Sequence, residues 1–138
     1  MHKVLQQYLM IKKRVLKVKT FARWAKNVLT DAQLCLAAKE ILLDQYEADL
    51  GSGLCKKRIA KAGQGKSSST RTLVAKEGKH CIFFIAGREK SDPGTDFSTA
   101  NIDAAKLIGS ALQRANQAKI DDLITEGTLK EICNDNFG

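Results

Sequence analysis

The segment Cys81–Ala86 (CIFFIA) limits the fold more than any other, because it is the longest fully apolar run in the chain. It is far shorter than the ~20 apolar residues that a helix needs to cross a bilayer. A short apolar run that is rich in aromatic and β-branched residues is typical of a strand buried on both faces. We therefore expect a central strand here, with other elements covering both faces of its sheet.

Three other segments also predict strands. Arg14–Lys19 alternates apolar and basic residues, which is typical of a half-buried strand with a basic outer face. Leu54–Lys61 and Thr70–Lys76 lie on either side of a glycine- and serine-rich loop, Gly63–Ser69. With the central segment, they predict a small, mostly antiparallel sheet of about four strands.

Two helices are expected between the first and second strands. Thr20 is placed to cap a helix whose apolar residues recur at i, i+3, i+4 and i+7. Thr30 and Gln33 match a T-x-x-Q capping box at the start of a second helix. The apolar stripe of that helix continues to Tyr46, and we expect it to stop near residues 51–53 (GSG). The two helices would form a hairpin laid on the sheet.

The C-terminal third is expected to be helical. Ser91–Ser98 contains the only proline and reads as a loop. Asn101–Gln117 has an amphipathic pattern, and Ile120–Ile132 is expected to form a final helix or helix pair, interrupted near Gly127. The order of elements predicts an α+β fold with helices packed on a small sheet.

The length of 138 residues suits one domain. We expect a domain over residues 10–133, a poorly ordered N-terminal extension over 1–9, and a tail over 134–138. Because the chain shows no secretory signal and no C-x-x-C pair, reduced thiols in a cytoplasm are expected for all four of its cysteines: Cys35, Cys55, Cys81 and Cys133.

The segment Lys56–Leu73 (KKRIAKAGQGKSSSTRTL) carries the strongest functional signal. It holds six basic residues within sixteen positions and no acidic residue: Lys56, Lys57, Arg58, Lys61, Lys66 and Arg71. Residues 1–80 have 17 Lys and Arg against 6 Asp and Glu, whereas residues 81–138 have 6 against 9. A cationic loop between strands is suited to a polyanion such as nucleic acid, although a solvated basic surface would give the same composition.

Two other kinds of site are disfavoured. Gly63–Ser67 (GQGKS) invites a P-loop reading, but Ala60 stands where that motif needs its first glycine, and a strand rather than a helix is expected to follow. Only two histidines are present, His2 and His80, which is too few for a histidine-based catalytic pair or a zinc site. No metal and no cofactor are therefore expected.

Basic residues alone can support RNA cleavage, because the 2′-hydroxyl of RNA can attack its own phosphate. Lysine and arginine can stabilise the pentacovalent phosphate by charge, and a lysine with a lowered pKa can accept the proton. Arg71, on a strand next to the loop, suits a phosphate clamp, and Arg88 is expected to lie at a sheet end where it can join Arg71. From the residues alone, binding without cleavage is favoured over cleavage.

Four segments together resemble a known family: FARWAKNVLTDAQLC, ADLGSGLCKKRIAKAGQGKSSSTRTLVA, CIFFIAGREK and NIDAAKL. They are similar to the RelE/ParE toxins of bacterial type II toxin–antitoxin modules, closest to the RelE/HigB-like branch. The resemblance covers nearly the whole chain, and the string G-L-x-K-K-R-x-A-x-x-G-Q-G-K-S followed by R-T-L is specific to it. It implies a compact antiparallel sheet with two N-terminal helices on it.

The resemblance also implies metal-independent cleavage of mRNA, usually on the translating ribosome. Arg71 matches the family arginine of the strand after the loop, and Arg88 matches the one after the central strand. The lysine-rich hairpin matches the region that holds phosphate-binding or general-base groups, without singling out one lysine as the base. We therefore expect catalytic roles for Arg71, Lys66, Lys57 and Arg88. RNA contacts are expected from Lys56, Arg58, Lys61, Lys90, Lys17 and Lys19.

The same resemblance predicts partners and location. A cognate antitoxin, of helix-turn-helix type and encoded nearby, would neutralise the toxin, and operator DNA would be bound only through the toxin–antitoxin complex. The expected substrates are mRNA and the 70S ribosome in a bacterial cytoplasm, with no membrane contact. Two alternatives remain open: a ParE-like toxin that binds gyrase without nuclease activity, and a non-enzymatic nucleic-acid-binding protein of the same fold.

Overall fold

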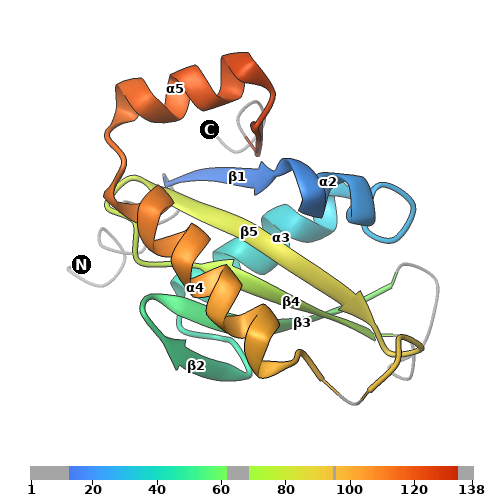
Figure 1. Cartoon of the computed structure of the whole chain (residues 1–138). Coiled ribbons are helices and arrows are strands. Elements are labelled where there is room, and N and C mark those ends of the chain that lie inside the picture. Colours follow the sequence, from blue (N-terminus) through green and yellow to red (C-terminus); the bar gives the residue numbers. More distant parts are fainter. Residues whose placement is uncertain (1–12, 62–68, 95, 134–138) are drawn as a thin grey trace, which may run out of the picture.

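The protein is an α+β structure, as the sequence predicts, with helices on both faces of one sheet (Figure 1). The computed structural model describes residues 13–61, 69–94 and 96–133. Its elements are, in chain order, β1 (Arg14–Val18), α2 (Lys19–Ala25), α3 (Asp31–Leu42), β2 (Ala48–Gly51), β3 (Leu54–Ala60), β4 (Ser69–Ala75), β5 (Cys81–Glu89), α4 (Thr99–Arg114), α5 (Gln117–Glu126) and β6 (Leu129–Ile132).

The sheet has six strands in the order β2-β3-β4-β5-β1-β6. All neighbouring pairs are antiparallel except β1 and β5, which run parallel. The four strands expected from the sequence are β1, β3, β4 and β5. The other two, β2 and β6, form the two edges of the sheet and were not expected.

The apolar run of β5 lies at the centre, between β4 and β1, and is buried as predicted. One face of the sheet is covered by α2 and α3: the ring of Phe21 on α2 contacts Phe84. The other face is covered by α4, whose Gly109 lies so close that an added Cβ would be 3.1 Å from the Cβ of Ala75 on β4. Figure 1 shows α4 crossing in front of the sheet, with α3 behind it.

The second helix is shorter than its apolar stripe predicts. Its start is confirmed, because Thr30 and Gln33 form both hydrogen bonds of the capping box. It ends at Leu42, and Asp44 adopts a left-handed backbone conformation with φ 62°. Tyr46 therefore lies outside the helix, and the prediction that the helix continues to residues 51–53 is wrong. The released segment pairs with β3 as β2, because an edge strand satisfies backbone groups that the helix no longer uses.

The predicted cap of the first helix is also wrong. Thr20 lies inside α2, and Val18 occupies the N-cap position without a side-chain hydrogen bond. The helix follows β1 directly, so its first turn begins where the strand ends. The backbone N–H of Lys19 donates to the carbonyl of Thr128 at 3.0 Å, which satisfies one free donor of that first turn.

The C-terminal end departs further from the prediction. The helix expected to Gln117 ends at Arg114, and Gln117 begins α5 after the Asn116 cap. Gly127, with φ 84°, ends α5 in the left-handed conformation that favours glycine. Residues 129–132, expected to be helical, form β6 and pair with β1. A helix there would leave one edge of β1 without hydrogen-bond partners.

Two of the four cysteines are joined. Cys35 on α3 forms a disulfide with Cys133, directly after β6, across 98 residues of sequence. The expectation of four reduced thiols is therefore wrong for this pair, whereas Cys55 and Cys81 are free and buried. Cysteine spacing did not indicate the bond, because only the return of the chain to β1 brings Cys133 beside α3. The predictions for residues 1–9 and 134–138 concern segments outside the described residues.

Candidate functional site

Three arginines lie side by side on the α4-covered face of the sheet. In the strand register, Arg58 on β3 pairs with Arg71 on β4, and Arg71 pairs with Arg88 on β5. Lys56 precedes Arg58 by two residues and so shares its face. Like charges directly opposite one another destabilise a sheet. The arginine side chains of this row therefore repel one another, and a bound anion relieves the repulsion. A phosphate-binding surface has this property.

Arg71 is the middle member of this row. Its side chain is partly exposed, and its guanidinium makes no hydrogen bond or ion pair with another described residue. A planar guanidinium that is held by a central strand and left without a carboxylate partner can receive two phosphate oxygens at once. Its position therefore suits the phosphate clamp expected from the sequence.

Arg88 lies beside Arg71 as predicted, but its guanidinium already has partners. It is only 8% exposed. Its Nη2 donates to the carbonyls of Asp92, Pro93 and Gly94 at 2.9, 3.1 and 3.0 Å, and its Nη1 donates to the carbonyl of Asp96. In this conformation Arg88 holds the segment after β5 in place. Its Nε is buried and has no hydrogen-bond partner in the part of the chain that the structure describes.

The carboxylate of Asp96 lies next to the arginine row. It forms an ion pair with Lys56, and its Oδ1 accepts the backbone N–H of Phe97 at 2.8 Å. Partial burial raises the pKa of Asp96, but the hydrogen bonds from Lys56 and Phe97 and the charges of Lys56 and Arg71 outweigh that effect. The pKa of Asp96 is therefore lowered, and this side chain stays ionised at neutral pH.

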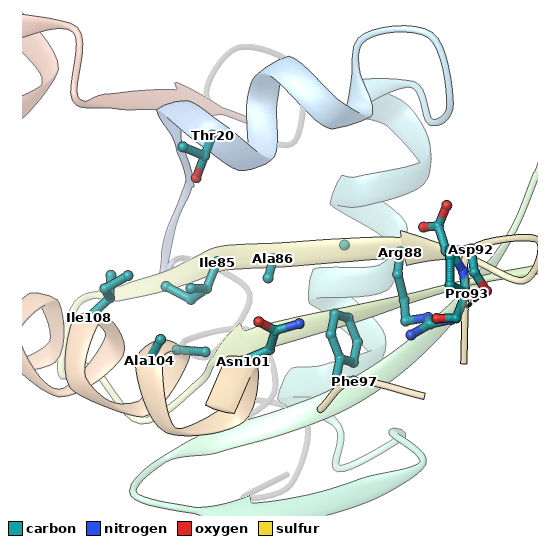
Figure 2. A pocket seen from close by; sticks show the side chains of 12 residues that line it. Thr20, Ile85, Ala86, Arg88, Asp92, Pro93, Phe97, Asn101, Ala104 and Ile108 are labelled. Atoms are coloured by element: carbon teal, nitrogen blue, oxygen red, sulfur yellow. Dashed lines mark hydrogen bonds between the residues drawn. The ribbon is translucent and has the colours of Figure 1, made fainter. Parts of the chain in front are cut away.

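A pocket of about 470 Å³ continues from the row along β5 (Figure 2). Ile85 and Ala86 on β5 line it together with Asn101 on α4 and Thr20 on α2. Arg88 and Phe97 lie together at one end (Figure 2). This volume is within the range of small-ligand sites, about 300–1,000 Å³. The surface thus combines a cationic row with an adjoining pocket lined by both polar and apolar residues.

Other predicted residues lie elsewhere. Lys57 points to the face covered by α2 and α3, where it pairs with Glu40 at 3.0 Å and donates to the carbonyl of Gln45 at 2.8 Å. Lys17 is on the same covered face, buried and paired with Asp31 at 2.8 Å. The structure therefore does not bring either lysine to the row. The reason is the two-residue period of a strand, which sends Lys56 and Lys57 to opposite faces.

Three further predicted residues are peripheral to the row, and one is not described. Lys61, just after β3, pairs with Glu89 at 2.8 Å. Lys19 begins α2 and Lys90 follows β5, and both are exposed. Lys66 lies outside the described residues. In the part of the chain that the structure describes, no cluster of three or more His, Cys, Asp or Glu is arranged to hold a metal ion.

The family model described as the RelE toxin of the RelE/RelB toxin–antitoxin system matches residues 13–132, which span every helix and strand described above.

The chain belongs to the RelE toxin family.

Membership implies a cognate antitoxin as partner. A search of curated proteins finds no match. None of the helices in the described residues has the length and apolar character of a membrane span.

Sequence reasoning missed two features of this RelE-family site. Asp96 lies in the loop expected at Ser91–Ser98, and its ion pair with Lys56 depends on how that loop packs on the sheet. The pocket residues Phe97 and Asn101 were also missed, because a single sequence does not show which side of α4 faces β5. Arg58 was expected to bind RNA, but only the strand register places it in line with Arg71 and Arg88.

Proposed function

We propose that this RelE-family toxin is an endoribonuclease that cleaves mRNA on the translating ribosome and thereby inhibits translation and growth. The observation that carries the proposal is the register of Arg58, Arg71 and Arg88 on one face of the sheet, next to Lys56. RNA supplies the phosphates that such a row of like charges lacks. Family membership supports the same reading.

In the proposed reaction, the 2′-hydroxyl of one nucleotide attacks the adjacent phosphorus, and the bond from phosphorus to the 5′-oxygen breaks. Arg71 contacts the non-bridging oxygens and stabilises the additional negative charge of the pentacovalent phosphate. Arg58 and Lys56 hold neighbouring phosphates and so fix the strand on the sheet. The lysine-rich hairpin, which includes Lys66, supplies the acceptor for the 2′ proton. Proton return to the 5′-oxygen completes a transfer that needs no metal.

An antitoxin protein is the proposed inhibitor. A segment with acidic side chains can cover the basic row by charge complementarity and exclude RNA from Arg71. We also propose that this antitoxin is of helix-turn-helix type and encoded nearby, that the toxin acts in the bacterial cytoplasm, and that it meets operator DNA only within the toxin–antitoxin complex.

Primer extension on a reporter mRNA, after induction of the protein in cells, tests the proposal. The wild-type protein is expected to produce cuts inside the reading frame and to arrest growth. Arg71→Ala removes a guanidinium that has no hydrogen-bond or ion-pair partner among the described residues, and it is expected to reduce cleavage at least about 100-fold, which is typical for the loss of one charge-stabilising group. Arg114→Ala is the matched control, because Arg114 is exposed at the end of α4.

Each alternative gives a different result. Growth arrest with intact mRNA would reject the nuclease and favour a toxin that binds gyrase. Binding to RNA without cleavage or arrest would identify a purely binding member of the fold. Equal loss of cleavage in Arg71→Ala and Arg114→Ala would show that the arginine row is not the site.

A further inference from the structure

The segment between β5 and α4 folds back onto the arginine row instead of extending away from it. Four backbone carbonyls of this segment, those of Asp92, Pro93, Gly94 and Asp96, accept hydrogen bonds from Arg88. Because the Arg88 guanidinium is fixed by β5 and is nearly buried, these contacts set the position of the segment. The sheet therefore determines where the side chain of Asp96 lies.

The Asp96 carboxylate is placed where a substrate anion is expected. It accepts a hydrogen bond from Lys56 Nζ and lies in the electrostatic field of Arg71. A carboxylate and a phosphate share the same chemistry toward these groups, since both present acceptor oxygens and negative charge to lysine and arginine. Asp96 is thus a chemical substitute for phosphate, supplied by the chain itself.

We propose that the Asp96 carboxylate occupies the subsite in which Lys56 and Arg71 receive a phosphate of RNA, so that this segment competes with the substrate. The inference rests on the proposed function, because it takes RNA as the substrate. RNA binding must first break the ion pair between Lys56 and Asp96. The affinity of the protein for RNA is therefore lower than the basic row alone would give.

The side chain is suited to this exchange. The ion pair is partly exposed, with the Lys56 side chain 23% and the Asp96 side chain 38% accessible, so solvent screening keeps it weak. The Arg88 contacts use only backbone carbonyls and do not involve the carboxylate. Asp96 can therefore release Lys56 by side-chain rotation, which also breaks its hydrogen bond from the Phe97 N–H, while the carbonyls bound by Arg88 stay in place.

The test compares RNA affinity in two variants of equal net charge. Asp96→Asn removes the competing charge, whereas Asp103→Asn removes a charge from an exposed position on α4. Fluorescence anisotropy with a 2′-O-methyl RNA oligonucleotide, which cannot be cleaved, measures the affinity. We expect Asp96→Asn to bind about two- to fivefold more tightly than Asp103→Asn, the range for a partly exposed ion pair. Equal affinities would overturn the proposal.

A double-mutant comparison isolates the subsite. In a Lys56→Gln background there is no ion pair to break, so Asp96→Asn is expected to give little further gain. The same gain in both backgrounds would show a general electrostatic effect and would also overturn the proposal. Asparagine can still accept the Phe97 N–H. If melting curves show that Asp96→Asn is unfolded, Asp96→Ser provides the same comparison with a smaller acceptor.

Failure of this inference is distinguishable from failure of the proposed function. The oligonucleotide is not cleaved, so its affinity reports on the subsite whether or not the protein is a nuclease. Intact reporter mRNA would reject the proposed function. Equal affinities of Asp96→Asn and Asp103→Asn would reject only the competition by Asp96.

Discussion

At the scale of single residues, neighbouring basic side chains have very different surroundings. Lys56 and Lys57 are adjacent in sequence, yet one meets Asp96 beside the arginine row and the other meets Glu40 under α3. Arg71 and Arg88 are adjacent in the sheet, yet one guanidinium is without a hydrogen-bond partner among the described residues and the other holds four carbonyls. Charge in the sequence therefore indicates a basic protein, but contacts decide which charges are available to a ligand.

Arg88 gives a residue-scale prediction. Arg88→Lys keeps the positive charge. The single ammonium group of lysine cannot donate to all four carbonyls, so some of these carbonyls lose their hydrogen-bond partner. We expect the free energy of unfolding to fall by about 1–3 kcal/mol, the cost of unsatisfied buried polar groups. Urea denaturation measures this change, and proteolysis between β5 and α4 should accelerate. Arg114→Lys on the exposed end of α4 is the control. An unchanged unfolding midpoint for Arg88→Lys would show that the carbonyl contacts are not stabilising.

At the scale of elements, local sequence signals indicated where α3 begins but not where it ends. The capping box at Thr30 was readable because both partners lie three residues apart. The end of α3 was not readable, because the apolar stripe continues to Tyr46 and competes with a left-handed residue at Asp44. Similarly, residues 129–132 have no strong strand pattern and become β6 because β1 offers an open edge.

The capping box gives the element-scale prediction. Thr30→Ala removes the acceptor for the Gln33 N–H and is expected to lower the free energy of unfolding by about 1 kcal/mol. Urea denaturation followed by circular dichroism measures it. Thr99→Ala is the matched control, since Thr99 is exposed in the first turn of α4 and Ser98 provides the cap there. Equal effects of the two substitutions would contradict a capping role for Thr30.

At the scale of the whole molecule, the disulfide between Cys35 and Cys133 ties α3 to the end of β6. A cross-link over 98 residues restricts the unfolded chain strongly. Reduction is therefore expected to lower the free energy of unfolding by about 2–4 kcal/mol. The measurement is urea denaturation with and without a phosphine reductant. A Cys35→Ser, Cys133→Ser double variant should show no effect of reductant, and an equal effect in that variant would contradict this assignment.

The sequence by itself determined the α+β class, the buried central strand, the four inner strands β1, β3, β4 and β5, and the basic character of the first half. These follow from periodicity, apolar runs and composition, which are properties of short segments. It also pointed to the RelE family, and the family comparison confirms this. It also indicated that Arg88 can join Arg71, because Arg71 lies near the start of one predicted strand and Arg88 just past the end of the next.

Only the tertiary structure decided which basic residues share a face and which of them are already paired. Strand register aligns Arg58 with Arg71 and Arg88, and a shift of one residue would have brought Lys57 to the row instead. The ion pair between Lys56 and Asp96, the carbonyl contacts of Arg88 and the disulfide all join residues that are distant or unpatterned in sequence. Such contacts depend on how the elements pack, and no local pattern encodes them.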